Sequence, residues 1–321
     1  MRAILHERYG RPDVLEVRDV DKPAIGDDQV LVRVHASSVN PVEWYGVSGP
    51  YFARFGNGMR RPKDQTVGAD LAGTVEAVGQ DVTSLQRGDE VFGVSGASWA
   101  DYTLAREDRL AKKPANLTFE EAAAVPVAGV TALQALRDKG GVQPGQNVLV
   151  NGASGGVGTF AVQLAKAFGA DVTAVCSTGN VEQARSLGAD RVVDYTKEDF
   201  TKLGVEHDLM LDIAGSRSFL ECRRVLTPEA TFVLVGGRMT YRGLGPLPHL
   251  GGTILKSRFR SQTVTFFVAQ VTTGDLTFLA DLLESGTIRA VIDRTYAVDD
   301  APAALAYLGD GHARAKVVIT V

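Results

Sequence analysis

Short segments rich in β-branched residues dominate the first part of the chain. The segments MRAILHE, VLEVRDV, QVLVRVHASSVN, LAGTVEAVG and DEVFGV are separated by Gly, Pro and Asp, a pattern typical of strands and turns. The pattern changes at Thr118, which has capping-box spacing to Glu121 ahead of an Ala-rich stretch. We therefore predict a β-rich domain followed by a helix that is broken near Pro126.

From Gly145 the pattern alternates between strand and helix. QNVLVNG and ADVTAVCS are predicted strands, and in GVGTFAVQLAKAFG apolar residues recur every three or four positions, as on one face of a helix. Further predicted strands are DRVVDY, HDLMLDIAG and ATFVLVGG, with helices at NVEQARSLG and SFLECRRVL. This alternation predicts an α/β fold with a doubly wound parallel sheet at 123–267. The closing helices and the strand AKVVITV are expected to complete the β-rich domain, as 1–122 and 268–321.

Composition and charge exclude several functional classes. The 321 residues are 45% hydrophobic and 22% charged, as in ordinary globular proteins, and the net charge of −4 comes without a basic block for nucleic acid. Apolar runs fall short of the ~20 residues that cross a bilayer. The first residues, MRAILHERYG, lack the features of a targeting signal, so we expect a cytoplasmic protein that binds neither nucleic acid nor membrane.

Cysteine and histidine are too sparse for a disulfide framework or a metal site. The two cysteines, Cys176 and Cys222, lie far apart in the sequence, and the five histidines occur singly. A zinc site needs three or four ligands at workable spacing. We therefore expect no protein-bound metal.

The segment from Asn151 to Gly158 is rich in glycine and follows the strand NVLV directly. Ala153, Gly155 and Gly158 occupy the three glycine positions of GxGxxG at the start of a predicted helix. Glycine at such a turn lets the backbone approach a pyrophosphate, whose charge is stabilised by the helix N-terminus. The segment thus predicts a dinucleotide site, and a merely tight turn is the plain alternative.

The same residues also read as GxSxG, the nucleophile elbow of α/β-hydrolases, with Ser154 as the nucleophile. Asp212 followed by His249 or His312 has the required order for a triad. No HGGG-type oxyanion loop precedes the turn, which favours the dinucleotide interpretation. A serine esterase that uses Ser154 remains the alternative function.

The residues after the second strand bear on the identity of the dinucleotide. An acidic residue about 20 positions beyond the glycines binds the ribose 2′-hydroxyl of NAD. Here Cys176 is followed by Ser177, Thr178, Gly179 and Asn180, with no carboxylate among them, and Arg185 is a candidate partner for a phosphate. We therefore predict NADPH rather than NADH.

Several motifs in the same order resemble the zinc-independent, quinone oxidoreductase type of the medium-chain dehydrogenase/reductase superfamily. They are SSVNPVEWYG, VGADLAGTVEAVG, RGDEVFG, VPVAGVTALQAL, NGASGGVG, SLGADRVVDY and GHARAKVVI, which together span nearly the whole chain. Asn40 stands where the zinc-dependent relatives have a catalytic Cys, and Gly68-Ala69-Asp70 stands where they have Gly-His-Glu. The resemblance implies a Rossmann domain, a GroES-like catalytic domain, and an active site in the cleft between them.

The resemblance also implies the site residues. Asn40 is expected near the nicotinamide, and Tyr45 and Tyr51 on the substrate side, where either of them or solvent supplies a proton. Lys316 is expected to be structural. The expected cofactor contacts are Ser154, Gly155, Gly156 and Val157 at the pyrophosphate, Ser177 and Tyr195 at the 2′-phosphate, Gly236, Gly237 and Phe267 at the nicotinamide, and His312, Ala313 and Arg314, of which Arg314 pairs with phosphate.

These expectations combine into one predicted activity. Without a Lewis acid, alcohol oxidation is poorly supported, whereas reduction of a quinone or an activated C=C bond needs only hydride and hydrogen-bond donors. We therefore expect an NADPH-dependent reductase of quinones or α,β-unsaturated carbonyls, with a non-catalytic NADPH-binding protein as a further alternative. The resemblance also implies a homodimer that pairs sheet edges near TVTFFVAQV.

Overall fold

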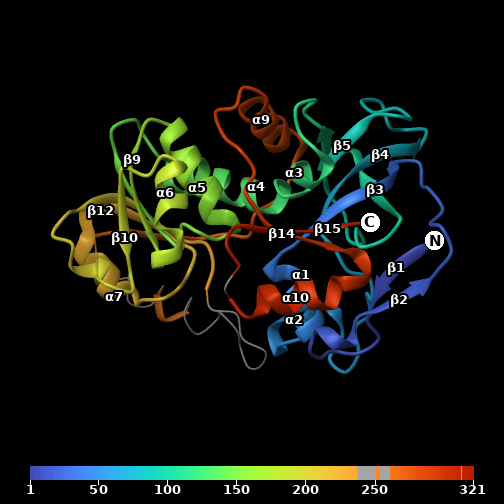
Figure 1. The fold of residues 1–321 in the computed structure, drawn as a ribbon, viewed down its shortest axis with the longest axis horizontal. Helices are drawn as coiled ribbons and strands as arrows, with labels where there is room; N and C mark the ends of the chain where they lie inside the picture. Colours follow the sequence, from blue (N-terminus) through green and yellow to red (C-terminus); the bar gives the residue numbers. More distant parts are fainter. Residues whose placement is uncertain (238–250, 254–260, 312) are drawn as a thin grey trace. The chain divides into compact units, whose positions relative to one another are not determined.

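The computed structural model describes residues 1–237, 251–253, 261–311 and 313–321, and these form two compact units (Figure 1). The first unit holds the described residues of 1–130 and 270–321, and the second unit holds those of 131–269. The sequence had suggested divisions at 122/123 and 267/268, a few residues away from these positions.

The first unit is built around a mostly antiparallel sheet. In the described chain its order is β14-β15-β3-β4-β5-β7, with β6 also paired to β3, while β1 and β2 form a separate pair. The C-terminal β15 pairs with β3 through Val317 and Val39, so the end of the chain belongs to this unit. The strands are β1 (Arg2–Leu5), β2 (Glu16–Asp19), β3 (Gln29–Val39), β4 (Asp70–Val78), β5 (Glu90–Val94), β6 (Tyr102–Arg106), β7 (Leu110–Lys112), β14 (Ile292–Ala297) and β15 (Lys316–Thr320).

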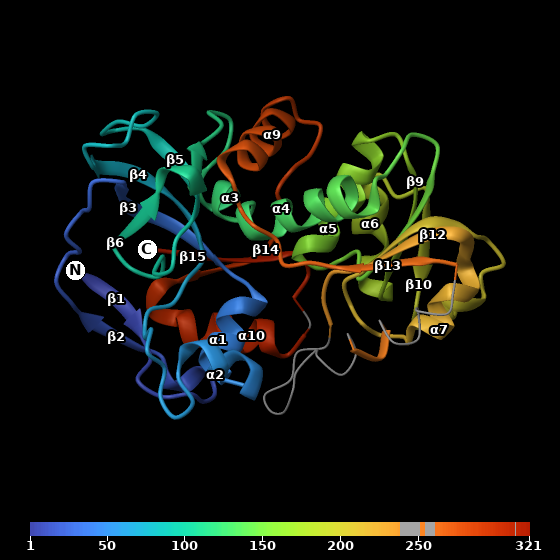
Figure 2. The same cartoon turned by 180° about the vertical axis from the view of Figure 1, so that it is seen from behind.

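Helices cover this sheet or flank its strands. The helices that begin in the first unit are α1 (Pro41–Ser48), α2 (Tyr51–Asn57), α3 (Phe119–Ala123), α4 (Pro126–Gln134), α9 (Thr273–Glu284) and α10 (Ala301–Gly309), and both views show α1 beside α10 (Figures 1 and 2). Thr118 and Glu121 form the predicted capping box on α3, and α4 begins at the predicted break, Pro126. The sequence did not predict that α4 continues as a π-helix over Ala135–Gly140.

The second unit contains the predicted doubly wound parallel sheet, which confirms the α/β fold class. Its described order is β10-β9-β8-β11-β12-β13, and each pairing is parallel. The strands are β8 (Asn147–Asn151), β9 (Asp171–Cys176), β10 (Arg191–Asp194), β11 (His207–Asp212), β12 (Leu226–Leu234) and β13 (Thr263–Phe266), and the helices are α5 (Gly156–Ala167), α6 (Val181–Ser186) and α7 (Phe219–Cys222). Short 3-10 turns in the two units lie at Pro12–Val14, Glu107–Arg109, Thr178–Asn180, Phe200–Lys202, Arg223–Val225 and Val298–Asp300.

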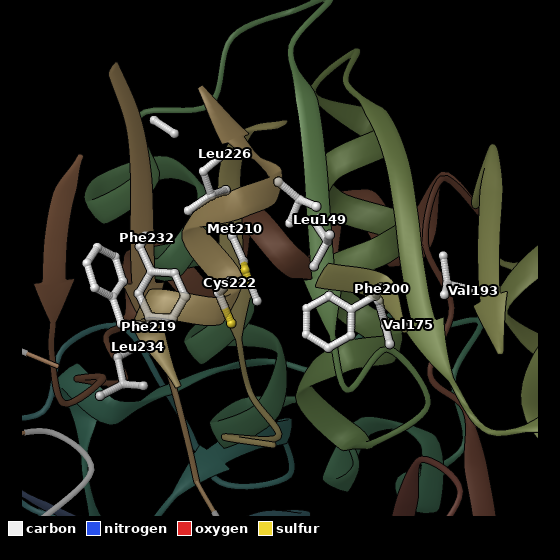
Figure 3. Packing of buried hydrophobic residues seen from close by; sticks show 12 residues of the cluster. Leu149, Val175, Val193, Phe200, Met210, Phe219, Cys222, Leu226, Phe232 and Leu234 are labelled. Carbon is white, nitrogen blue, oxygen red and sulfur yellow. The ribbon is translucent and has the colours of Figure 1, made fainter. Parts of the chain in front are cut away.

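One apolar cluster of the second unit packs α7 against the sheet (Figure 3). Phe219 of α7 meets Phe232 of β12 edge-on, with the ring centroids 5.4 Å apart. Cys222 lies in the same cluster, where burial raises its thiol pKa, and both cysteines are free and buried. None of the described helices has the length and hydrophobicity needed to span a membrane.

Candidate functional site

The carboxyl ends of the parallel strands collect several of the expected cofactor residues at one edge of the second unit. The order of the sheet reverses at β8, because β9 and β10 lie on one side of it and β11 to β13 on the other. Ligands of open α/β sheets bind at such a switch point, beyond the carboxyl ends of the strands. The turns after successive strands bring Ser154, Ser177, Tyr195, Gly236 and Phe267 to this edge.

The turn between β8 and α5 has the shape that a pyrophosphate requires. Gly152 has a φ of +96°, and a Cβ on Gly158 would lie 2.1 Å from the Gly152 carbonyl oxygen, so both positions need glycine. A Cβ on Gly155 would meet only that oxygen, at 3.7 Å, and otherwise project into open space. Residues 154–157 are partly exposed at the start of α5. The turn therefore fits a nucleotide phosphate.

Buried polar side chains at the ends of β8 and β11 stabilise the turn between β8 and α5. Asn151 and Asp212 end the adjacent strands β8 and β11, and the Asn151 Nδ2 donates to Asp212 Oδ1 at 2.7 Å. The Gly215 amide donates to the same oxygen at 3.1 Å. The hydrolase alternative needs Asp212 to orient a histidine, and both candidate histidines, His249 and His312, lie outside the described residues.

Ser177 and Tyr195 are neighbours at the ends of β9 and β10. Cys176 and Asp194, which precede them, are paired in the sheet. The Asn180 Nδ2 donates to Ser177 Oγ at 3.0 Å, so the Ser177 hydroxyl hydrogen is free to donate to another acceptor. Tyr195 is 57% exposed. Ser177 and Tyr195 thus lie on adjacent strand ends at the carboxyl edge of the sheet.

The carboxylate of Asp194 also lies at the edge formed by β9 and β10. This corrects the argument for NADPH, which counted no carboxylate there. Asp194 accepts hydrogen bonds from the hydroxyls of Thr178, at 2.6 Å, and Thr196, at 2.7 Å. These bonds, together with Lys197, lower the Asp194 pKa to about 2. From the sequence, only the residues after β9 are expected at this position, whereas parallel pairing brings Asp194 from the end of β10 to the same edge. Its oxygens are already occupied by protein donors. The candidate phosphate partner Arg185 is instead bound to Glu182 at 2.6 Å.

The other expected cofactor residues are divided between the two units. A Cβ on Gly236 would lie 2.6 Å from the Ile213 carbonyl oxygen, and Phe267 has the Lys139 ammonium 5.9 Å from its ring centroid. Gly237 is partly exposed next to Gly236. Ala313 and Arg314 belong to the first unit, where the Arg314 backbone N–H donates to Asp293 and its side chain is exposed.

A buried polar cluster lies at the centre of the first unit. Lys316, at the start of β15, places its Nζ 3.1 Å from Asp70 Oδ2 and donates to Asn40 Oδ1 at 2.5 Å. The Asn40 Nδ2 donates in turn to Asp70 Oδ2 at 2.9 Å. The relative exposures of Asn40, Asp70 and Lys316 are 3%, 0% and 3%. One buried ammonium therefore joins the side chains of Asn40, which follows β3, and Asp70, which begins β4.

Further contacts link this cluster to the surrounding elements. Asp70 accepts from the Ser38 hydroxyl at 2.5 Å and, through Oδ1, from the Val127 amide at 2.8 Å in the first turn of α4. Glu43 accepts from the amides of Asn40, at 2.7 Å, and Ala69, at 2.8 Å. Burial and the nearby Asp70 raise the pKa of Glu43 to about 7. The cluster thus fixes α1 and α4 to the start of β4.

Sequence reasoning missed Lys316, Asp70 and Glu43 as members of one cluster. The available signal was a lysine at the head of AKVVITV, an otherwise apolar strand, since a buried lysine needs an anionic partner. Among the described residues, no group of three or more His, Cys, Asp or Glu side chains is placed to hold a metal ion.

The two expected tyrosines lie on consecutive helices of the first unit. Tyr45, on α1, is partly buried, which raises its phenol pKa, and its ring contacts Phe52 edge-on at 5.1 Å. Tyr51 begins α2 and is 62% exposed. Val42 and Gly46 of α1 line a cavity of about 240 Å³ in this unit. Asn40 is the N-cap of the same helix that carries Tyr45.

Comparison with known proteins connects this architecture to a family. The alcohol dehydrogenase GroES-like domain matches residues 26–135, and the zinc-binding dehydrogenase family matches residues 187–319. The 2-methylene-furan-3-one reductase of Solanum lycopersicum is 36% identical over 99% of this chain and 79% of its own length. The chloroplast envelope quinone oxidoreductase homolog of Arabidopsis thaliana is 32% identical over 99% of this chain and 98% of its own length.

A solved structure gives the same result for the fold. The Escherichia coli quinone oxidoreductase, solved in complex with NADPH, superposes with a TM-score of 0.86 at 25% identity, and the match covers 100% of each chain. The sequence matches over nearly the whole chain and the shared architecture therefore indicate the same family. The chain belongs to the medium-chain dehydrogenase/reductase superfamily, among the oxidoreductases of the quinone oxidoreductase type.

Proposed function

We propose that the protein is an NADPH-dependent reductase of quinones and of C=C bonds conjugated to a carbonyl. The observation that carries this proposal is the glycine turn at the switch point of the parallel sheet. There the backbone at Gly155 is open to a phosphate, while Gly158 packs against the backbone of Gly152 and Ala153 in the same turn. Ser154, Gly156 and Val157 would hold the pyrophosphate beside Gly155.

In the proposed reaction, the main task of the protein is to position the acceptor beside the nicotinamide. When bound, the nicotinamide cofactor supplies a hydride, which is one proton with two electrons. Reduction of an enone would need a proton in addition to this hydride, and Tyr45 or solvent would supply that proton. A quinone takes up the same hydride and a proton to give the hydroquinone. The raised pKa of Tyr45 keeps its phenol protonated and able to donate.

The choice of NADPH rests on the edge formed by β9 and β10. Ser177 offers a hydroxyl hydrogen, Tyr195 offers an exposed phenol, and the oxygens of Asp194 already accept from protein donors. A solved relative bound NADPH, and another relative is named for reducing a methylene ketone. These features support NADPH as the hydride donor and a quinone or an activated C=C bond as the acceptor.

The cluster around Lys316 supports a reaction without zinc. The Lys316 ammonium already binds the side-chain oxygens of Asn40 and Asp70, and Asn40 stands where the resemblance places a catalytic Cys of the zinc-dependent relatives. A second cation among the same oxygens would be repelled at close range. We therefore propose that the protein needs no metal ion for turnover.

Steady-state turnover tests the proposal. Purified protein treated with a chelator is mixed with NADPH and either 1,4-benzoquinone or a simple enone, and oxidation of NADPH is followed by its absorbance. We expect turnover with at least one acceptor and a higher kcat/KM with NADPH than with NADH. Tight NADPH binding without turnover on any acceptor would instead identify a non-catalytic nucleotide-binding protein.

A further inference from the structure

The buried ammonium of Lys316 makes bonds that are unusual for a structural lysine. Lys113, another buried lysine of the first unit with a side chain 5% exposed, donates to the carbonyls of Pro114 and Leu117 and pairs with Glu90, which is half exposed. Lys316, with a side chain 3% exposed, instead donates to the side chain of Asn40 and pairs with the fully buried Asp70. Its bonds therefore go to a residue expected at the reacting centre.

These bonds determine how the Asn40 amide is oriented. An ammonium only donates and an ionised carboxylate only accepts, so Lys316 selects the amide oxygen and Asp70 selects the amide nitrogen. The NH₂ group has two hydrogens, and the bond to Asp70 uses one of them. The planar amide then fixes the direction of the second hydrogen. A rotated amide would place NH₂ against the ammonium and oxygen against the carboxylate, which is unfavourable at both ends.

The same bonds also change the strength of Asn40 as a donor. Hydrogen bonds in a chain polarise one another, and a cation on the carbonyl oxygen withdraws electron density from the amide nitrogen. The cluster is fully buried, so water does not screen this effect as it would at the surface. The remaining N–H of Asn40 is therefore a stronger donor than it would be in the same cluster without the Lys316 ammonium.

We infer that Lys316 is a positioning residue, which holds and polarises the Asn40 amide so that it donates to the oxygen on which negative charge develops during hydride transfer. This inference rests on the proposed reductase function and assigns to Lys316 and Asn40 the charge stabilisation that a metal ion provides in zinc-dependent relatives. Lys316 does not touch the substrate. Asp70 completes the arrangement, because it holds the amide nitrogen and also binds the first turn of α4 through Val127.

The test compares two buried lysines of the same unit. Lys316→Met removes the ammonium next to Asn40, and the matched control Lys113→Met removes a buried ammonium that has no contact with the cluster. We expect Lys316→Met to lower kcat about 10- to 100-fold, the usual effect of losing a supporting partner of a reacting group. The Kd for NADPH, measured by nicotinamide fluorescence, should change less than about twofold because the nucleotide turn belongs to the other unit. Lys113→Met should lower thermal stability while keeping kcat.

Two further variants separate charge from folding. Lys316→Arg keeps a cation and should recover part of the kcat that Lys316→Met loses. Where Lys316→Met leaves Asp70 unpaired and the protein does not fold, Asp70→Asn/Lys316→Met removes both buried charges, a change that folded proteins often tolerate. This double variant should show the same loss of kcat with an unchanged Kd for NADPH.

The possible results are distinguishable. A folded Lys316→Met or double variant with wild-type kcat would overturn the inference while leaving the reductase function intact. An equal loss of kcat in Lys113→Met would also overturn it, because the effect would then follow from general destabilisation. Wild-type protein that oxidises NADPH with neither quinone nor enone would refute the proposed function, and the inference with it.

Discussion

Glu43 makes the stability of the first unit depend on pH in a direction that can be calculated. Its carboxyl is buried, and although it accepts from the amides of Asn40 and Ala69, burial and Asp70 raise its pKa from 4.5 to about 7. Between these values the folded protein holds a proton that the unfolded chain has released. The contribution of Glu43 to stability is therefore fully present below pH 4.5 and is lost as the pH rises through 7.

The size of this effect follows from the two pKa values. A rise of this size corresponds to about 3 kcal/mol, most of which is lost between pH 5 and pH 8. Glu43→Gln removes the titrating group while keeping the volume. Compared with this variant, the wild type should therefore lose about 2 to 3 kcal/mol more of its unfolding free energy across that interval.

Urea unfolding followed by tryptophan fluorescence measures this loss in the relevant unit. The chain's two tryptophans, Trp44 and Trp99, are both buried in the first unit, so their emission reports its unfolding. Glu121→Gln is the matched control, because Glu121 makes the same capping-box contact on α3 from a partly exposed position. It should leave the difference between the two pH values as in the wild type. Equal pH dependence in the wild type and Glu43→Gln would refute the reasoning.

Three further predictions concern the second unit. Gly155→Ala should keep the wild-type Tm but weaken NADPH binding, because its methyl group enters open space at the phosphate turn. Gly158→Ala should lower both the Tm and the affinity for NADPH, because its methyl group would overlap the Gly152 carbonyl. Ser177→Ala and Tyr195→Phe should weaken NADPH binding in calorimetry and leave NADH binding unchanged; equal effects on both would remove these hydroxyls from the 2′-phosphate site. Light scattering should give a homodimer, and Phe266→Lys on β13, an edge strand in the described sheet, should give a monomer.

Local signals in the sequence predicted much of the fold. The capping box at Thr118, the break at Pro126 and the turn from β8 into α5 depend on neighbouring residues, so their patterns were sufficient. The π-helix over Ala135–Gly140 was not predictable, since its residues continue a helical pattern and the irregular turn depends on tertiary packing. The segment containing Tyr45 and Tyr51 also lacked a clear pattern, yet it forms α1 and α2.

The candidate site was less accessible to sequence reasoning than the fold. Lys316 is separated from Asn40 and Asp70 by 276 and 246 residues, and only the pairing of β15 with β3 places it beside them. Asp194 likewise reaches the β9 edge through parallel pairing rather than through its position after the glycine turn. In both cases the chemistry depends on which strands are neighbours, which the residue pattern alone did not determine.

Transfer of deuterium tests the central claim most directly. NADPH carrying deuterium at both C4 positions is incubated with the protein and an enone, and the saturated product is analysed by mass spectrometry and NMR. The account predicts one deuterium at the β-carbon of the product, because the hydride of the cofactor forms that C–H bond. A saturated product without deuterium, or NADPH that binds without being consumed, would contradict hydride transfer by this protein.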